Sequence, residues 1–267
     1  MLSARGLFTE ILENDDSFSL FCSIAASGES QGGWENSRIA ALVPASQRGM
    51  APKIARHGAD EDKHGRIFLA LLHKRELETV PVPPDTDYTM LLERAGIGLT
   101  HARLRQDEAL SEQDIVTYLA HSRVTEQRAS EQMRLLLKHF GDHPELGRAV
   151  RAISHDEDNH LAYCHEELLR LARSGHARSI HRILRDCAHA EIRVYRDVSI
   201  SVMNHMADIL GWSHAKIGTL RSGIHAVYAY ERAVSWRRMT SLTWPADNLN
   251  ALGATPPSEP VTAKTSH

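Results

Sequence analysis

Residues 60–64 read Asp-Glu-Asp-Lys-His, and residues 156–160 read Asp-Glu-Asp-Asn-His. Both copies contain the pattern Glu-x-x-His, in which the paired residues are Glu61/His64 and Glu157/His160. Positions i and i+3 of a helix share a face about one turn apart, so each carboxylate converges with its imidazole on one point. The repeated pattern therefore predicts two helices that each direct a Glu and a His toward a common site.

Apolar residues spaced by three and four predict a long helix around each copy. The first runs from about Gln47 to Leu77, and its inner face reads Met50, Ile54, His57, Glu61, His64, Phe68 and Leu71. The second runs from His143-Pro144 to Gly175, and its inner face reads Leu146, Val150, Ile153, Glu157, His160, Cys164, Leu168 and Leu171. Because a buried carboxylate is costly unless it is paired or binds a metal ion, these acids on a core face indicate a metal site.

A helix with one inward Glu precedes the first copy. Asp15, Asp16 and Ser17 provide an N-cap for a helix that runs to about Val43. Its inner face reads Phe21, Ile24, Gly28, Gln31, Glu35, Ile39 and Leu42. Glu29 is the rival acid, but six positions from Glu35 puts it on another face, so Glu35 is the expected ligand. The glycines of residues 27–33 leave open a loop between two shorter helices.

The second copy has the same arrangement. Residues 111–114 have a capping pattern and begin a helix that runs to Phe140. Its inner face reads Ile115, Leu119, Ser122, Glu126, Ala129, Met133, Leu136 and Phe140. The pentapeptides are 96 residues apart, and Glu35 and Glu126 are 91 apart; the upstream Glu precedes the motif Glu by 26 residues in the first half and by 31 in the second. The chain is therefore interpreted as a duplicated helical hairpin.

The remaining segments extend this all-α plan. Residues 80–84, Val-Pro-Val-Pro-Pro, end a helix and start a crossover. Further helices are expected at residues 2–13, 88–95, 178–211 and 213–242. We expect a single domain over residues 1–243, with a core bundle at 17–175 and the two additional C-terminal helices at 178–242. The Pro-rich residues 244–267 are expected to be a disordered tail.

The composition argues against several classes of protein. A net charge of −3 implies no bulk attraction to nucleic acid or to an anionic membrane, and no apolar run approaches membrane-spanning length. The three cysteines, Cys22, Cys164 and Cys187, form no Cys-x-x-Cys pair, which disfavours a disulfide framework, a structural zinc site and a built-in rubredoxin-type iron centre. Since the first residues lack the apolar run of a signal peptide, a cytoplasmic protein is expected.

Six side chains are the predicted metal ligands: Glu35, Glu61, His64, Glu126, Glu157 and His160. Four carboxylates offset the charge of two divalent ions, and hard oxygen ligands with two imidazoles suit iron or manganese. A pair of irons with open positions can bind O2 between them. The ligand types therefore suit a pair of iron or manganese ions.

Residues 17–175, with two Glu-x-x-His motifs and an upstream Glu for each, resemble the ferritin-like di-iron carboxylate superfamily. The resemblance implies an antiparallel four-helix bundle with a long crossover. It implies as cofactor two Fe ions, or Fe with Mn, which react with O2 or peroxide as the oxidant. It also implies that Asp60 and Asp156, which match the Asp of the Asp-Glu-x-Arg-His motif in bacterial monooxygenases, hydrogen-bond the ligand imidazoles. The Arg of that motif is Lys63 in the first copy and Asn159 in the second, a departure from those enzymes.

Three more residues are candidates near the site. His57, one turn before Glu61, fits a metal ligand, a proton relay or a hydrogen-bonded core histidine, and we assign it to the shell around the ligands. Ser130 lies four residues after Glu126, where monooxygenases resemble one another in having a Thr near the O2 side. Gln31 is flanked by glycines on the inner face of its helix and is expected to line a pocket.

These features fit more than one function. The first is an O2-activating oxidoreductase acting on a small organic substrate, with an external electron donor, either a ferredoxin or a reductase; the helices after Gly175 would cover or extend its cavity. The alternative is a ferroxidase, a peroxidase or an iron-handling protein of the rubrerythrin type. A third is a helical scaffold with a structural metal or none. No nucleic-acid or membrane partner is expected, and a homodimer is left open.

Overall fold

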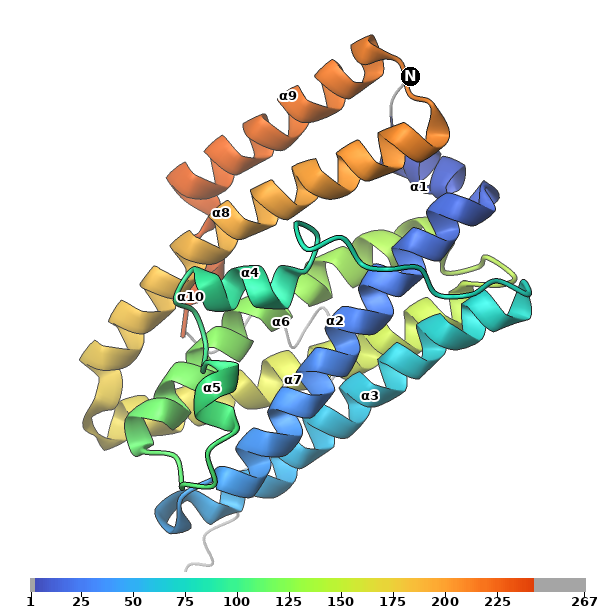
Figure 1. The fold of residues 1–267 in the computed structure, drawn as a ribbon. Helices are drawn as coiled ribbons and strands as arrows, with labels where there is room; N and C mark the ends of the chain where they lie inside the picture. Colours follow the sequence, from blue (N-terminus) through green and yellow to red (C-terminus); the bar gives the residue numbers. More distant parts are fainter. Residues whose placement is uncertain (1–2, 243–267) are drawn as a thin grey trace, which may run out of the picture.

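The computed structural model describes residues 3–242, and every regular element within that range is helical (Figure 1). In chain order the elements are α1 (Ala4–Glu13), α2 (Asp15–Leu42), the 3-10 turn η1 (Ala45–Met50), α3 (Ala51–Lys74), α4 (Tyr88–Arg94), α5 (His101–Leu104), α6 (Glu112–Phe140), α7 (Gly147–Leu171), the π-helical turn η2 (Ala172–His176), α8 (Ala177–Leu210), α9 (His214–Tyr230), the π-helical turn η3 (Glu231–Ser235) and α10 (Arg237–Thr240). The all-α prediction is confirmed over this range. The predicted tail, residues 244–267, lies outside the described residues.

Two pairs of long helices hold the centre of the molecule. α2 packs along α3, α6 packs along α7, and α3 contacts α7 (Figure 1). α2 is continuous through Gly28 and Gly33, so the alternative of a loop there is wrong. α7 begins at Gly147 rather than near His143, because the His143 ring accepts hydrogen bonds from the backbone N–H groups of Glu145 and Leu146 and forms a turn before the helix.

The apolar core is divided into two parts by a layer of polar side chains. On α3, Ile54 belongs to one apolar cluster and Phe68 to the other, with the first Glu-x-x-His between them. On α7, Ile153 and Leu168 bracket the second motif in the same way, in opposite chain direction. Apolar packing therefore seals the polar layer at both ends of the bundle.

Glycines allow α2 and α3 to approach closely. A Cβ atom on Gly33 would overlap Asp62 Oδ1. A Cβ on Gly58 would lie 3.0 Å from the backbone oxygen of Gly33, and one on Gly65 would lie 3.0 Å from Ser30 Oγ. Each of these three glycines therefore sits where the partner helix fills the space a side chain would need.

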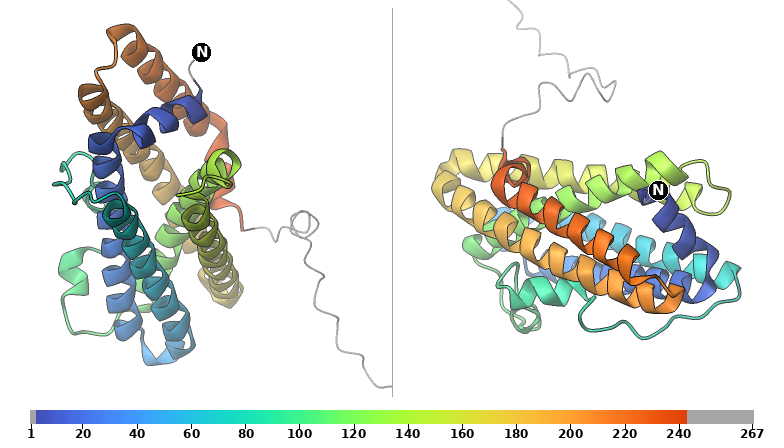
Figure 2. Two further views of the ribbon diagram at one scale, coloured as in Figure 1. Left: turned by 90° about the vertical axis from the view of Figure 1, so that its right-hand side faces the viewer. Right: turned by 90° about the horizontal axis from the view of Figure 1, so that it is seen from above.

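A buried ion network attaches the C-terminal helices to the bundle. Arg128 of α6 donates hydrogen bonds to Glu191 of α8, at 2.7 and 3.0 Å, and to Glu231 of η3, at 2.8 and 2.9 Å. Glu191 also accepts a bond of 2.9 Å from the Tyr88 hydroxyl of α4. Figure 2 shows α8 and α9 lying across the side of the bundle. The network thus joins three parts of the chain: α6, the C-terminal elements α8 and η3, and α4, which belongs to the crossover between α3 and α6 (residues 75–111).

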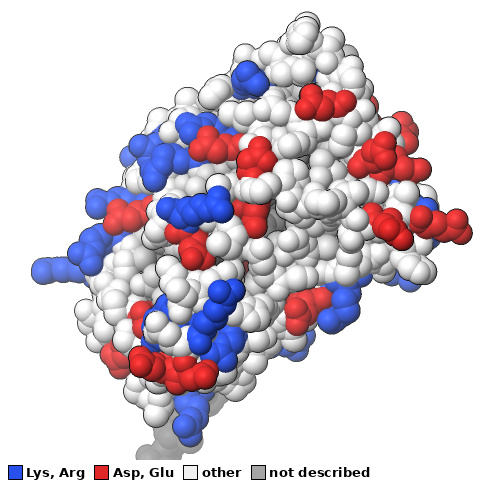
Figure 3. Space-filling model, in the orientation of Figure 1, with Lys and Arg blue, Asp and Glu red and all other residues white. Residues whose placement is uncertain are grey.

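The surface carries charges of both signs. On the face seen in Figure 3, Lys and Arg side chains are interspersed with Asp and Glu. Within residues 3–242, no helix combines the length and the apolar character needed to cross a membrane.

Replacing Gly58 by Ala is expected to destabilise the protein by about 1–3 kcal/mol, because the new methyl group would press on the backbone of α2 and on Asn36 Cβ. Gly28→Ala is the matched control, since a Cβ there meets nothing within 4 Å and should stabilise the helix by roughly 0.5–1 kcal/mol. Urea denaturation of the two variants measures both changes. Equal stabilisation by both substitutions would contradict the close helix approach.

Candidate metal centre

Seven residues form two overlapping groups in the polar layer, and within each group the candidate ligand atoms lie within 4.8 Å of one another. The first group is His57, Glu61, Glu126 and His160; the second is Glu29, Glu61, His64 and Glu157. Glu61 belongs to both groups. The four long helices α2, α3, α6 and α7 all contribute, so the site exists only when both helix pairs are assembled.

In the first group, the nitrogens of two stacked imidazoles face two carboxylates. His57 Nε2 lies 3.1 Å from Glu61 Oε1 and 3.2 Å from Glu126 Oε1. His160 Nδ1 lies 3.3 Å from Glu61 Oε1 and 3.7 Å from Glu126 Oε2. The two rings pack at a centroid distance of 3.9 Å. Four ligand atoms of the kind that binds divalent iron or manganese thus point to a common centre.

In the second group, His64 Nδ1 lies 3.4 Å from Glu29 Oε2 and 3.5 Å from Glu157 Oε1. The Nδ1 atoms of His64 and His160 are both buried, and neither makes a hydrogen bond to any residue between 3 and 242. A buried nitrogen without a hydrogen bond is costly. A cation at the centre of each group would satisfy these atoms, so the residues present fit a two-metal site.

The structure brings five of the six predicted ligands together and replaces the sixth. The prediction of Glu35 as a ligand is wrong, because Glu35 is in neither group and the rival acid Glu29 takes that position. The two acids do lie on different faces of α2, but the Glu29 face, with Ala26 and Gly33, packs against α3. The error arose because α2 has neighbours on two sides: α3 on one, and α4, α5 and α8 on the other.

The sequence held a signal for Glu29 in its spacing. Glu29 precedes Glu61 by 32 residues, and Glu126 precedes Glu157 by 31. Glu35, at 26, breaks this match. Nearly equal spacing in the two halves of a duplicated hairpin is therefore a better guide than the apolar pattern of α2, which is apolar on more than one face.

Behind the imidazoles, two aspartates and a lysine form an outer layer. Asp156 Oδ2 lies 3.1 Å from His64 Nε2, and Asp60 Oδ2 lies 3.7 Å from His160 Nε2. Each motif's Asp therefore faces the other motif's His. Lys63 Nζ donates to Asp60 Oδ1 at 2.9 Å and to Asp156 Oδ2 at 2.5 Å. Asp156 hydrogen-bonds the His64 ring, as predicted, but the same prediction is wrong for Asp60, because its carboxylate is bound by Arg56 and Lys63 and lies too far from His160 Nε2 for a hydrogen bond. Lys63, the departure from the monooxygenase motif, links the two carboxylates.

A chain of hydrogen bonds determines which nitrogen of His57 carries a proton. The Tyr118 hydroxyl donates to Asn36 Oδ1 at 2.7 Å, so the Tyr163 hydroxyl, 2.7 Å away, must donate to Tyr118. His57 Nδ1, 2.7 Å from Tyr163, must then donate to Tyr163. The proton is held on Nδ1, and Nε2 is directed at Glu61 and Glu126. His57, which we had assigned to the surrounding shell, is therefore arranged like a ligand.

Protonation balances the charge of the cluster. Burial, together with neighbouring Glu61 or Glu126, raises the pKa of Glu29 and Glu157 well above the ordinary value. Burial opposes ionisation of Glu61, but His160 and His57 outweigh it and lower its pKa to about 2. Burial likewise lowers the pKa of His57 and His160, but their carboxylate neighbours raise it above the usual value. The metal-free cluster then holds two neutral acids, Glu29 and Glu157. The carboxylates of Glu61 and Glu126 pair with the two protonated histidines.

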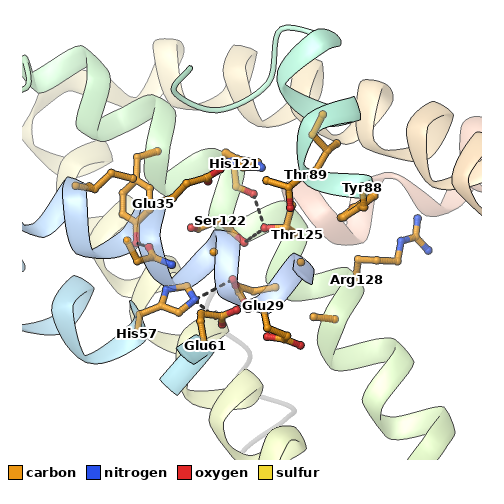
Figure 4. A pocket seen from close by; sticks show the side chains of 18 of the residues that line it. Glu29, Glu35, His57, Glu61, Tyr88, Thr89, His121, Ser122, Thr125 and Arg128 are labelled. Carbon is orange, nitrogen blue, oxygen red and sulfur yellow. Dashed lines mark hydrogen bonds and ion pairs between the residues drawn. The ribbon is translucent and has the colours of Figure 1, made fainter. Parts of the chain in front are cut away.

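A cavity of about 220 Å³ adjoins the cluster. In Figure 4, Glu29, His57 and Glu61 lie on one side of this cavity, and Glu35 and His121 lie on the other. Its wall also contains the Ser122 and Thr125 side chains of α6, Tyr88 and Leu92 of α4, Leu99 and Tyr118. The cavity therefore lies between the candidate ligands and the crossover, where a small molecule could reach the cluster.

The two predicted pocket residues lie elsewhere. Gln31 donates to Asp87 Oδ2 at 3.3 Å, because its face of α2 meets the start of α4. Ser130 donates to Asp158 Oδ1 at 2.8 Å, on the α6–α7 contact. Neither is among the residues that line the cavity, although Ala129, next to Ser130, is one of them.

Tyr163→Phe is expected to lower the free energy of unfolding by about 1–3 kcal/mol, because it leaves the buried Nδ1–H of His57 without an acceptor. Tyr230→Phe is the control: Tyr230 is 60% exposed, and loss of its hydroxyl should change stability by less than about 0.5 kcal/mol. Chemical denaturation of the metal-free proteins compares them. Equal stabilities would refute the hydrogen-bond chain.

Metal uptake is expected to release up to four protons for two divalent cations, from Glu29, Glu157, His57 and His160, whose pKa values are all raised. The stability that these raised values provide is lost as pH rises through them, while cation binding strengthens. The melting-temperature gap between loaded and metal-free protein should therefore widen from about pH 4.5 upward, where the two acids ionise in the unfolded chain, and more steeply above about pH 6.5, where the two histidines lose their protons in the unfolded chain. Calorimetric melting across pH, with a pH-indicator dye for proton release, measures both; a constant gap would contradict the expectation.

Comparison with known proteins gave no relative: no protein-family model, no curated protein and no solved structure matches this chain.

Proposed function

We propose that this chain is a ferritin-like di-metal oxidoreductase that uses O2 or peroxide to oxidise a small organic molecule. Two metal ions, iron or iron with manganese, would be held by Glu29, His57, Glu61, His64, Glu126, Glu157 and His160. The observation that carries the proposal is that two ligand groups share Glu61 and contain buried Nδ1 atoms without hydrogen bonds. When bound, a pair of such ions supplies redox chemistry and a binding place for O2.

The donor set supports iron or manganese. Four carboxylates and three imidazoles are hard or intermediate ligands, and the three cysteines, Cys22, Cys164 and Cys187, are in none of the groups. Replacement of four protons by two divalent cations leaves the charge of the cluster unchanged, so the buried site tolerates the exchange. The Asp60–Lys63–Asp156 link lies behind the two rings, and its Asp156 hydrogen-bonds His64.

The cavity supports a small-molecule substrate over simple iron handling. It borders Glu29, Glu61 and Glu126 directly and is limited on the far side by α4 and the crossover. Arg128 and Tyr88, two of its lining residues, are held by Glu191 of α8, so the C-terminal helices support the cavity wall. Electrons would come from an external donor, a ferredoxin or a reductase. Ferroxidase or peroxidase activity of the rubrerythrin type is the alternative.

The test is anaerobic loading with Fe(II), elemental analysis and single-turnover reaction with O2. We expect two irons per chain, and roughly one or none in Glu29→Gln and Glu157→Gln, since loss of ligands couples to loss of metal. Glu166→Gln, at an exposed position of α7, is the control and should keep both ions. Full metal content in both ligand variants would reject the assignment. Consumption of O2 with oxidation of Fe(II) alone, by a large hollow oligomer, would favour the iron-handling alternative.

A further inference from the structure

The Glu35 carboxylate has an imidazole partner outside the metal centre. Its Oε1 lies 2.8 Å from His101 Nε2, at the start of α5. The ring of Trp34 packs edge-on against the His101 ring at 4.9 Å. Glu35 also lines the cavity that borders Glu29 and Glu61. The residue thus joins the cavity to a histidine on the crossover.

His101 continues this connection toward the surface. Its backbone N–H donates to Glu93 Oε2 at 3.3 Å, and its Nδ1 lies 3.8 Å from the same oxygen. The side chains of Glu35, His101 and Glu93 are 16, 17 and 23% exposed. An acid, an imidazole and a second acid therefore form a line from the cavity wall to partly solvated positions. Side chains of these types pass protons directly within hydrogen-bond reach, as between Glu35 and His101, and through one water over the longer gap to Glu93.

The surroundings favour a carboxyl group that can hold a proton. Burial raises the pKa of Glu35, and Glu93 and Asp87 of the α4 region raise it further, while His101 of α5 opposes them. On α2 itself, the Arg38 guanidinium is turned away and donates to Leu104 O and Asp107. The charged groups near Glu35 thus leave His101 as its cationic or donor partner.

We propose that Glu35 and His101 form the proton-delivery route into the cavity. This inference rests on the proposed function, because reduction of O2 or peroxide consumes protons. The O–H bond of the Glu35 carboxyl breaks and its proton passes to an oxygen atom of the reactant in the cavity. The Nε2–H of His101 then restores the carboxyl, and His101 regains a proton from water beside Glu93. The electrons come from the metal ions, reduced beforehand by the external donor.

The experiment compares wild type, Glu35→Gln and His101→Phe, each loaded anaerobically with Fe(II). Metal content should stay at the wild-type level, while the rate of reaction with O2 at pH 7 should fall roughly 10- to 100-fold in both variants. Formate should restore part of the rate in Glu35→Ala, which leaves space for a small acid. Infrared difference spectra of the metal-free protein should lose one protonated-carboxyl band in Glu35→Gln.

Asp107→Asn provides the matched control, because Asp107 pairs with Arg38 between the same crossover and the same helix, but outside the cavity, and is 93% exposed. An equal slowing in this variant would mean that Glu35 and His101 only anchor the crossover. Loss of metal in Glu35→Gln would show that Glu35 is a metal ligand. An unchanged rate and pH profile in both variants would contradict the proton-delivery route. If wild-type protein takes up no metal or does not react with O2, the proposed function fails as well, and that result is seen before any variant is compared.

Discussion

The mutual repulsion of four largely buried carboxylates is the constraint on which the centre of this molecule depends. Glu29, Glu61, Glu126 and Glu157 come from four helices and converge on three imidazoles. Their charge is balanced either by protons on two acids and two histidines or by cations. The two apolar clusters at either end keep bulk water from solvating these charges. The polar layer is therefore stable only when its net charge is close to zero.

Close helix packing makes that convergence possible. Gly33, Gly58 and Gly65 let α2 and α3 approach until backbone and short side chains touch. The helix pairs α2–α3 and α6–α7 then each present their acids to the other. The outer aspartates cross between the halves, since Asp60 faces His160 and Asp156 faces His64. The duplicated motif is therefore completed in space by its partner copy, with Lys63 between them.

The parts outside the bundle give the cluster an approach from one side. α4 and the crossover limit the cavity, and Glu191 of α8 holds Arg128 and Tyr88 in its wall. A bare four-helix bundle has no equivalent of this support. The same crossover brings His101 to Glu35. The face of α2 that carries Glu35 was predicted to hold a metal ligand, but it lines the cavity.

Sequence alone determined the all-α class and indicated the long helices, the two Glu-x-x-His pairs and Glu126, because apolar spacing and motif spacing act within one helix. The outer aspartates were expected from the resemblance of the motif rather than from spacing. The tertiary structure decided the rest. Whether Glu29 or Glu35 faces the cluster depends on which side of α2 meets α3, and α2 has packing neighbours on two sides. The hydrogen-bond chain from Asn36 to His57 and the cavity join three or more helices. Such contacts arise only from the relative placement of helices, which no periodicity within a single helix specifies.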